Sequence, residues 1–236
     1  MIEIKDLKKM YGRRAVVDGV SLVIEKNKVF GFLGQNGAGK TTAMKMMVGL
    51  LRPDAGSVSI AGRSVLESET REIIGFMPEA PYFYERLTGF EFLKFCGDLF
   101  PRHRKKTGAE YEALLKKVGI FEAKDAPIRN YSKGMKQRLG FAQSLVNDPE
   151  YVFLDEPLDG LDPIGRREIK EIIKLLKQEG RTIFLNSHIL YDTEELCDEV
   201  GVIHKGKLLY AGSVKDFCSG KPLEDQFIAT VEAHNK

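Results

Sequence analysis

A glycine-rich loop between a predicted strand and a predicted helix limits the possible folds of this chain more than any other feature. Residues 34–41 read Gly-Gln-Asn-Gly-Ala-Gly-Lys-Thr, which matches the pattern G-x-x-x-x-G-K-[ST]. The apolar run 29–33 predicts a buried strand before the loop, and apolar residues at three- and four-residue steps predict a helix over 41–50. In this strand–loop–helix context the pattern binds phosphate. The sequence therefore predicts an α/β fold with a nucleotide-phosphate site.

The residues of this phosphate loop (34–41) contribute different chemistry. Its glycines let the backbone wrap around phosphate, so that successive N–H groups donate to the phosphate oxygens. A lysine charge beside the β- and γ-phosphates and a threonine hydroxyl for magnesium complete the loop. We therefore expect ATP and magnesium to bind here. The predicted nucleotide contacts are Gly34, Asn36, Gly37, Ala38, Gly39, Lys40, Thr41 and Thr42, with Thr41 also a magnesium ligand.

Two adjacent carboxylates supply the second part of the predicted site. Asp155 and Glu156 follow the apolar run 151–154, which predicts a buried strand that ends in acid. Asp155 at the carboxyl edge of a parallel sheet would hold magnesium, through water, and Glu156 would polarise an attacking water. Many buried strands end in a charged residue, so the two acids indicate a nucleotide site only in combination with the phosphate loop.

Two single residues are weaker candidates. His188 lies just beyond the predicted strand 182–185, where its ring would donate to the γ-phosphate. Tyr11 precedes Gly12 after the N-terminal strand pattern, where its ring would stack on adenine. A histidine without a catalytic task and a tyrosine at a strand end are the structural explanations for these positions. From the residue pattern alone, these structural explanations are favoured for both.

Strand and helix patterns alternate along much of the chain. This alternation predicts a parallel sheet covered by helices. The mainly helical stretch 88–118 and the helix 132–146 interrupt it, which indicates a helical subdomain inserted at about 85–148. The N-terminal residues 1–9 alternate apolar and polar side chains like a half-buried strand. Further strands are expected at 57–61, 73–77, 151–154, 182–185 and 200–203, and a further helix at 164–178.

Composition excludes several classes of protein. A formal net charge of +2 over 236 residues provides no general attraction to nucleic acid, so no nucleic-acid partner is expected. The basic run 102–106 is interpreted as a solvated loop. Three widely spaced cysteines indicate neither a disulfide framework nor a metal site, and favour a reducing compartment. The N-terminus lacks the apolar core of a signal peptide and no apolar run is long enough for a membrane span, so we expect a soluble protein.

Residues 131–138, Tyr-Ser-Lys-Gly-Met-Lys-Gln-Arg, are similar to the signature segment of ATP-binding cassette (ABC) proteins, usually Leu-Ser-Gly-Gly-Gln. Residues 157–162 are similar to the D-loop of the same family. Taken in order, the motifs resemble those of the nucleotide-binding subunit of ABC transporters along essentially the whole chain. The resemblance implies a single P-loop NTPase domain of the ABC type. It would comprise a core at about 1–84 and 149–215 with an N-terminal antiparallel β subdomain, the inserted α-helical subdomain at about 85–148, and a tail at 216–236.

The resemblance also implies how such a chain works. Ser132 and Gly134, at a helix N-terminus that favours an anion, would contact the γ-phosphate held by an opposite protomer. Two copies, or this chain and a related ATPase subunit, would form a head-to-tail pair around two ATP molecules. Glu79, at the place of the Q-loop glutamine, would approach magnesium or water. The partner would be an integral-membrane permease, which would keep the subunit in the cytoplasm at the inner face of the cell membrane.

Several positions depart from the usual family pattern. Lys133 replaces a signature glycine, Asp159 replaces a D-loop serine, and Glu79 carries a charge where glutamine is usual. Ser-Lys-Gly-Met, Pro-Glu at the Q-loop and Leu-Glu-Asp-x-Phe near the C-terminus resemble one branch of the family. That branch exports drugs, lipids, polysaccharides or other hydrophobic cargo through a separate six-helix permease.

Two alternatives stay open at this stage. A soluble ABC-type ATPase acting on ribosomes or DNA usually carries two cassettes or an inserted coiled coil, and this chain shows one cassette without a sustained heptad run. An ordinary P-loop kinase or GTPase leaves the signature segment unexplained. The aromatic stretch 81–87 fits either a surface covered by the membrane partner or a small satellite core.

Overall fold

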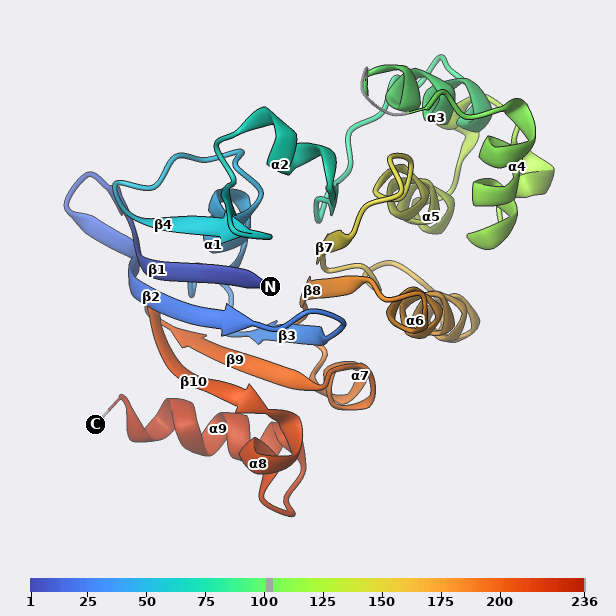
Figure 1. Ribbon diagram of the computed structural model, residues 1–236. Helices are drawn as coiled ribbons and strands as arrows, with labels where there is room; N and C mark the ends of the chain where they lie inside the picture. Colours follow the sequence, from blue (N-terminus) through green and yellow to red (C-terminus); the bar gives the residue numbers. More distant parts are fainter. Residues whose placement is uncertain (101–103, 236) are drawn as a thin grey trace.

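The computed structural model describes residues 1–100 and 104–235, and it contains two β-sheets (Figure 1). The first has the strand order β2-β1-β4-β5, and its paired strands are antiparallel. The second has the order β10-β9-β3-β8-β7-β6. The predicted α/β fold with an N-terminal antiparallel subdomain is confirmed. The first sheet consists of β1 (Ile2–Tyr11), β2 (Arg14–Ile24), β4 (Ala55–Ile60) and β5 (Arg63–Ser64), and the second of β3 (Val29–Leu33), β6 (Ile74–Met77), β7 (Tyr151–Asp155), β8 (Thr182–Asn186), β9 (Glu199–His204) and β10 (Lys207–Ser213).

Five strands of the second sheet run parallel, so their carboxyl ends meet at one edge. The sixth strand, β10, is antiparallel to β9, so the predicted parallel sheet carries one antiparallel strand at this edge. Lys205 and Gly206 form the hairpin turn with positive φ angles of 48° and 83°. The residues of β10 are half-buried or exposed without regular alternation, which is why the period-two pattern is missing from its sequence.

The second sheet has a core on each face because side chains alternate along its buried strands. Phe30 and Phe32 of β3 point towards the first sheet, and Val29 and Leu33 point to the opposite face. Helix α1 (Lys40–Met47) packs between the two sheets. Met44, Met46 and Met47 of this helix are all fully buried, so its buried surface is wider than one stripe of apolar residues at three- and four-residue steps. A helix that packs between two sheets is apolar around most of its circumference, because little of its surface faces solvent.

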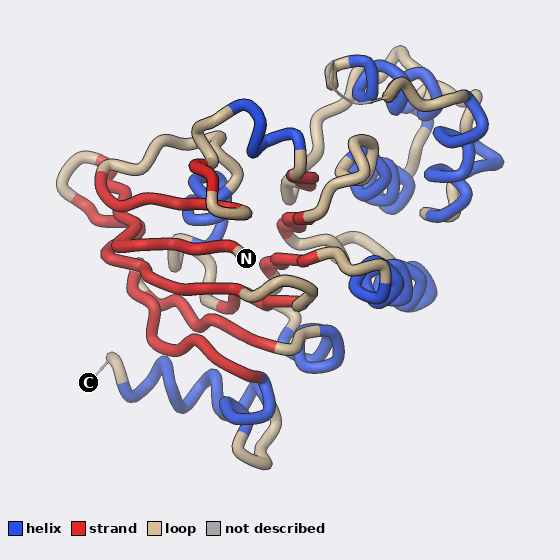
Figure 2. Tube along the Cα trace, viewed as in Figure 1, coloured by secondary structure: helices blue, strands red, loops and turns tan. Residues whose placement is uncertain are grey.

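Helices α3, α4 and α5 lie together, away from the N-terminal sheet (Figures 1 and 2). Ser132 caps α5, as predicted, because its hydroxyl accepts a hydrogen bond from the Met135 N–H at 3.2 Å. The helices agree with the predicted helical subdomain, whose limits at about 85 and 148 stay a prediction. Their bounds are Gly89–Asp98 for α3, Gly108–Lys117 for α4 and Lys133–Gln143 for α5, with short 3-10 turns at Phe121–Ala123 and Ile128–Asn130.

The remaining helices cover the second sheet and its outer edge. The described part of the predicted tail contains α9 and the end of α8, so it is ordered helical structure (Figure 1). Within the described residues, no helix combines the length and the apolar character that crossing a bilayer requires. The bounds are Ser68–Glu72 for α2, Pro163–Gln178 for α6, Leu190–Leu196 for α7, Val214–Cys218 for α8 and Leu223–Ala233 for α9.

The aromatic stretch 81–87 has two kinds of residue. Phe83 is buried and packs edge-on against Phe92, with ring centroids 5.1 Å apart. Tyr82 is 94% exposed, and Tyr84 is exposed beside Phe95. Phe83 belongs to the core on the face of the second sheet opposite the first sheet, not to a separate satellite core. A surface covered by the membrane partner stays a prediction for the exposed Tyr82 and Tyr84.

The predicted solvated loop at 102–106 falls partly outside the described residues. Arg104 and Lys105 are exposed in a loop before α4, and the Arg104 guanidinium forms an ion pair with Glu110. The cysteines Cys96, Cys197 and Cys218 are free and buried.

Candidate nucleotide site

An open cleft of about 420 Å³ lies beside the carboxyl edge of the second sheet. The phosphate loop forms much of its wall, and three carboxylates and a histidine from other segments complete it. The sheet topology explains this meeting, because β3, β6, β7 and β8 all end at the same edge. The lining residues are Val16, Gln35, Asn36, Gly37, Gly39, Lys40, Thr41, Thr42, Glu79, Glu156, Asp159 and His188.

Two glycines of the phosphate loop are required by close backbone contacts. A Cβ atom at Gly34 would lie 2.6 Å from the carbonyl oxygen of Ile203. Gly39 has a φ of 109°, and a Cβ atom there would lie 2.4 Å from the carbonyl oxygen of Val16. Side chains at these positions would force the loop away from β2 and β9. The glycines therefore fix the path of a loop whose backbone faces the cleft.

Lys40 begins α1 and is 8% exposed. Its ammonium donates to the carbonyl oxygen of Gly34 at 2.7 Å. Burial lowers the pKa of Lys40, while the nearby carboxylates of Glu156, Asp155 and Glu79 act in the opposite direction. The charge is thus held over the loop by neutral carbonyl acceptors, from which it can move to a phosphate oxygen.

Glu156 combines backbone strain with a shifted acidity. Its φ is 52°, a left-handed conformation that a non-glycine residue adopts only when its surroundings enforce it. One carboxylate oxygen lies 2.8 Å from Nδ1 of His188 and accepts from the His188 backbone N–H at 3.2 Å. Burial raises the pKa of Glu156, and the contacts with His188 partly offset this effect. Strain and a raised pKa of this kind are common in catalytic carboxylates.

Asp155 lies directly before Glu156 and is 2% exposed. The Asn186 amide donates to its carboxylate at 2.9 Å, and the two residues are register partners at the ends of β7 and β8. Sequence reasoning overlooked Asn186, although the ends of neighbouring parallel strands were a usable signal. It also overlooked Gln137, whose buried amide donates to the Glu156 carbonyl at 2.9 Å. That contact joins α5 to the end of β7, and no local pattern indicates it.

The donors near the phosphate loop suit magnesium in their chemistry. Among the described residues, no group of three or more His, Cys, Asp or Glu side chains is arranged to hold a metal by itself. Magnesium commonly binds through one or two protein oxygens together with water and substrate phosphate. The hydroxyl of Thr41 and the carboxylate of Asp155 fit that pattern, and Glu79 is an exposed carboxylate at the cleft wall.

Gly34 and Ala38 of the phosphate loop do not line this cleft, and neither do three of the predicted nucleotide contacts outside the loop. Tyr11 is 55% exposed at the end of β1. Ser132 and Gly134 lie at the exposed start of α5, beside the D-loop (residues 157–162): Gly134 would bring a Cβ atom to 3.7 Å from the Gly160 carbonyl oxygen. The structure thus brings together the phosphate loop, Glu79, the two acids and His188, and leaves the signature segment apart from them.

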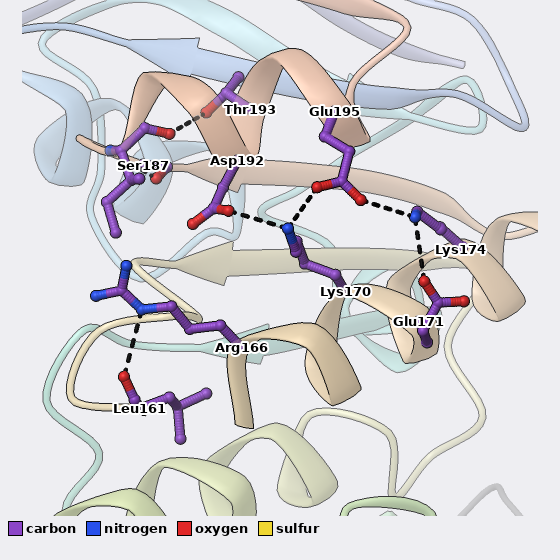
Figure 3. A network of polar contacts seen from close by, with 10 residues as sticks. Leu161, Arg166, Lys170, Glu171, Lys174, Ser187, Asp192, Thr193 and Glu195 are labelled. Atoms are coloured by element: carbon purple, nitrogen blue, oxygen red, sulfur yellow. Dashed lines mark hydrogen bonds and ion pairs between the residues drawn. The ribbon is translucent and has the colours of Figure 1, made fainter. Parts of the chain in front are cut away.

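An ion-pair network joins the helix that follows the D-loop to the helix that follows His188 (Figure 3). Lys170 of α6 contacts Asp192 of α7 at 3.2 Å and also pairs with Glu195. Lys174 pairs with the same Glu195 at 2.9 Å. Asp192 is buried, and one of its carboxylate oxygens has no hydrogen-bond partner within the described part of the chain. The network therefore supports the two segments that approach the cleft from the α6 and α7 side.

A phosphate loop, a strand that ends in paired acids and a parallel sheet edge together define a P-loop nucleotide-binding protein. Residues 17–159 match the model of the ABC transporter family. The chain belongs to this family and is an ABC ATPase domain.

Curated relatives extend the similarity beyond the matched segment. The lantibiotic transport ATP-binding protein SrtF of Streptococcus pyogenes is 39% identical, with 96% of each chain covered. The bacitracin transport ATP-binding protein BcrA of Bacillus licheniformis is 41% identical over 89% of this chain and 68% of its own length. An uncharacterized ABC transporter ATP-binding protein of Synechocystis sp. is 44% identical over 84% of this chain. This chain spans only 56% of that relative, and 66% of a similar one from Nostoc sp..

Solved structures agree with the fold. An ATP-binding subunit of an ABC transporter superposes with a TM-score of 0.88 at 29% identity, covering 98% of this chain and 99% of its own. A dimeric ATP-binding cassette bound to ADP and Pi has a TM-score of 0.83 at 20% identity, covering 91% and 99%. At that lower identity the likeness concerns the fold alone.

Proposed function

We propose that this chain hydrolyses ATP as one half of a head-to-tail dimer and thereby drives a membrane permease that exports its cargo. The separation of Ser132 from the cleft that contains Lys40 carries this proposal. The phosphate loop offers one wall for a triphosphate, and the signature segment offers a helix N-terminus that does not line this cleft. A second copy supplies the missing wall to each site.

The chemistry assigned to the cleft follows from its residues. Lys40 and the amides of the phosphate loop bind the β- and γ-phosphates, and the exposed ring of Tyr11 stacks on the adenine. Magnesium, when bound, neutralises phosphate charge and would be held by Thr41 and Asp155. Glu156 accepts a proton from the attacking water, because its raised pKa makes it a better base than an ordinary carboxylate. His188 orients Glu156 and donates to the γ-phosphate.

The signature segment suits the opposite role. Helix α5 has 11 residues, and its free N-terminal N–H groups together with the helix dipole favour an anion. Ser132 and Gly134 leave this end open to solvent. In the proposed pair they contact the γ-phosphate held by the partner, so that closure depends on ATP and hydrolysis allows opening.

The membrane partner is assigned to the apolar surface at the helical insertion. Tyr84 and Phe95 form an edge-on pair, and both are exposed together with Tyr82 and Leu99. Exposed apolar side chains that gather on one surface commonly mark a partner site. The relatives named for lantibiotic and bacitracin transport favour an exporter, in which this subunit lies at the inner face of the cell membrane.

Replacing the proposed base tests the dimer. We expect Glu156→Gln to keep ATP binding, to lower the rate of ATP hydrolysis by about a hundredfold or more, and to accumulate as a dimer with ATP and magnesium. Size-exclusion chromatography with light scattering reports the dimer, and phosphate release reports turnover. The same variant with ADP is the matched control and should remain monomeric. A monomeric variant that hydrolyses ATP at the normal rate would contradict the mechanism.

A soluble ATPase acting on ribosomes or DNA is the alternative, and the fraction that contains the protein distinguishes the two. A permease-bound subunit sediments with membranes, and a double substitution of Tyr82 and Tyr84 by serine should release it while ATP hydrolysis continues. Phe83→Ser is not suitable for this purpose, since that buried ring supports the fold. Sedimentation with ribosomes would favour the alternative.

A further inference from the structure

Two of the positions at which this chain departs from the usual family pattern contact each other. The Lys133 ammonium lies 2.8 Å from the Asp159 carboxylate. Lys133 belongs to the signature segment, whereas Asp159 belongs to the D-loop and lines the cleft that contains Lys40. A single ion pair therefore connects the segment proposed to close a partner's site with the wall of the chain's own site.

The backbone is shaped to admit this contact. Gly160 has a φ of 69°, and a Cβ atom there would lie 2.6 Å from Cε of Lys133. The aliphatic part of the lysine therefore crosses the D-loop where a side chain is absent. The contact thus involves the packing of the lysine stem on the backbone in addition to the attraction of the two charges.

The acidic lining of the cleft makes the Lys133–Asp159 ion pair relevant to nucleotide binding. Among the described residues that line the cleft, Glu79, Glu156 and Asp159 are acidic. Lys40 and His188 are the basic ones, and His188 contacts Glu156. A triphosphate that enters such a cleft is repelled by each unpaired carboxylate. The hydrogen bond from Lys133 lowers the pKa of Asp159, so the ion pair favours the charged form of this acid.

We propose that Lys133 is a positioning residue for the nucleotide site of its own chain: it neutralises Asp159 and holds that carboxylate towards the signature segment. The proposal rests on the assignment of the cleft to ATP. It also means that a nucleotide in one cleft is in electrostatic contact with the segment that completes the other. Because the side chain of Lys133 is 72% exposed and that of Asp159 is 44% exposed, the effect on affinity is only about two- to fivefold.

The test measures the affinity of the full chain for the β,γ-imido analogue of ATP with magnesium, by calorimetry. Lys133→Ala should weaken binding about two- to fivefold at low salt, and the loss should shrink at high salt because exposed charges are screened. Lys133→Arg should bind like the wild type. Adding Asp159→Asn to Lys133→Ala should restore the affinity, because the unpaired carboxylate is then gone.

Lys136→Ala is the matched control. It breaks a similar 2.9 Å ion pair between α5 and Glu85, about one helical turn away and outside the cleft, so the affinity should not change. Unchanged affinity in Lys133→Ala, or a loss in Asp159→Asn as large as in Lys133→Ala, would overturn the proposal. If the wild type itself binds no nucleotide, the assignment of the cleft fails instead. Thermal unfolding of each variant separates a folding defect from a binding effect, and Asp159→Asn alone should bind at least as tightly as the wild type.

Discussion

The phosphate loop and the signature segment are both predicted to contact nucleotide, but their surroundings differ. The loop is enclosed: Gly34 and Gly39 touch the backbone of neighbouring strands, and Lys40 is buried. The signature segment begins with exposed Ser132 and Lys133 at the start of a helix. An enclosed wall can bind a ligand by itself, whereas an exposed helix end gains its contacts on association. We therefore assign ATP affinity to the loop and dimer closure to the signature segment.

Removing the buried charge of Lys40 tests whether the phosphate loop provides the affinity for ATP. Lys40→Ala is expected to weaken ATP binding by about ten- to a hundredfold, the size of a lost charge-assisted hydrogen bond. Calorimetry with ATP and magnesium measures the change. Lys45→Ala removes an exposed lysine from the same helix and serves as the control with unchanged affinity. Equal affinities in the two variants would show that the loop is not the principal site of phosphate binding.

Changing the exposed helix end should separate closure from binding. Ser132→Ala removes the hydroxyl that caps α5, which should lower the free energy of unfolding by about 0.5–2 kcal/mol. Binding of ATP to the monomer should stay unchanged, while the ATP-driven dimer of a Glu156→Gln background should weaken about tenfold, as expected for the loss of one phosphate contact.

Ser213→Ala is the matched control for this experiment, because Ser213 caps α8 in the same manner at 3.0 Å. It should show a similar loss of stability with a normal dimer. If both variants form normal dimers by analytical ultracentrifugation, the signature serine has no part in closure.

Much of the fold followed from local patterns, and the exceptions share a cause. The phosphate loop and the strand that ends at Asp155 were predicted because each is a short segment whose residues act together. Strand β10 was missed because its side chains are not regularly buried, and burial of Met46 depends on a second sheet that the helix pattern does not reveal. Such features are decided by distant parts of the chain.

In the candidate site, too, individual residues could be predicted from the sequence, whereas the contacts between them could not. Glu156 and His188 were proposed separately, and the structure places them 2.8 Å apart. The strained φ of Glu156 has no sequence signal, since the strand pattern ends one residue before it. The pairing of Lys133 with Asp159 was also out of reach, because the two positions lie on different segments and each departs from the family pattern in a way that has no evident reason alone.

The ion-pair network between α6 and α7 lies outside the cleft, and we expect its disruption to have the smallest effect. It tests whether hydrolysis can change while the binding of ATP to the phosphate loop does not. Lys170→Met should keep the apolar stem but leave buried Asp192 without its cation, lowering the free energy of unfolding by about 1–2 kcal/mol. Urea denaturation measures this loss. Lys174→Met is the control, since its partners Glu171 and Glu195 are more exposed, and it should change stability by less than about 1 kcal/mol.

If the network positions His188 through α7, Lys170→Met should also slow ATP hydrolysis while ATP affinity, a property of the phosphate loop, stays the same. A loss of affinity without a loss of stability would instead place Lys170 among the residues that act on the nucleotide.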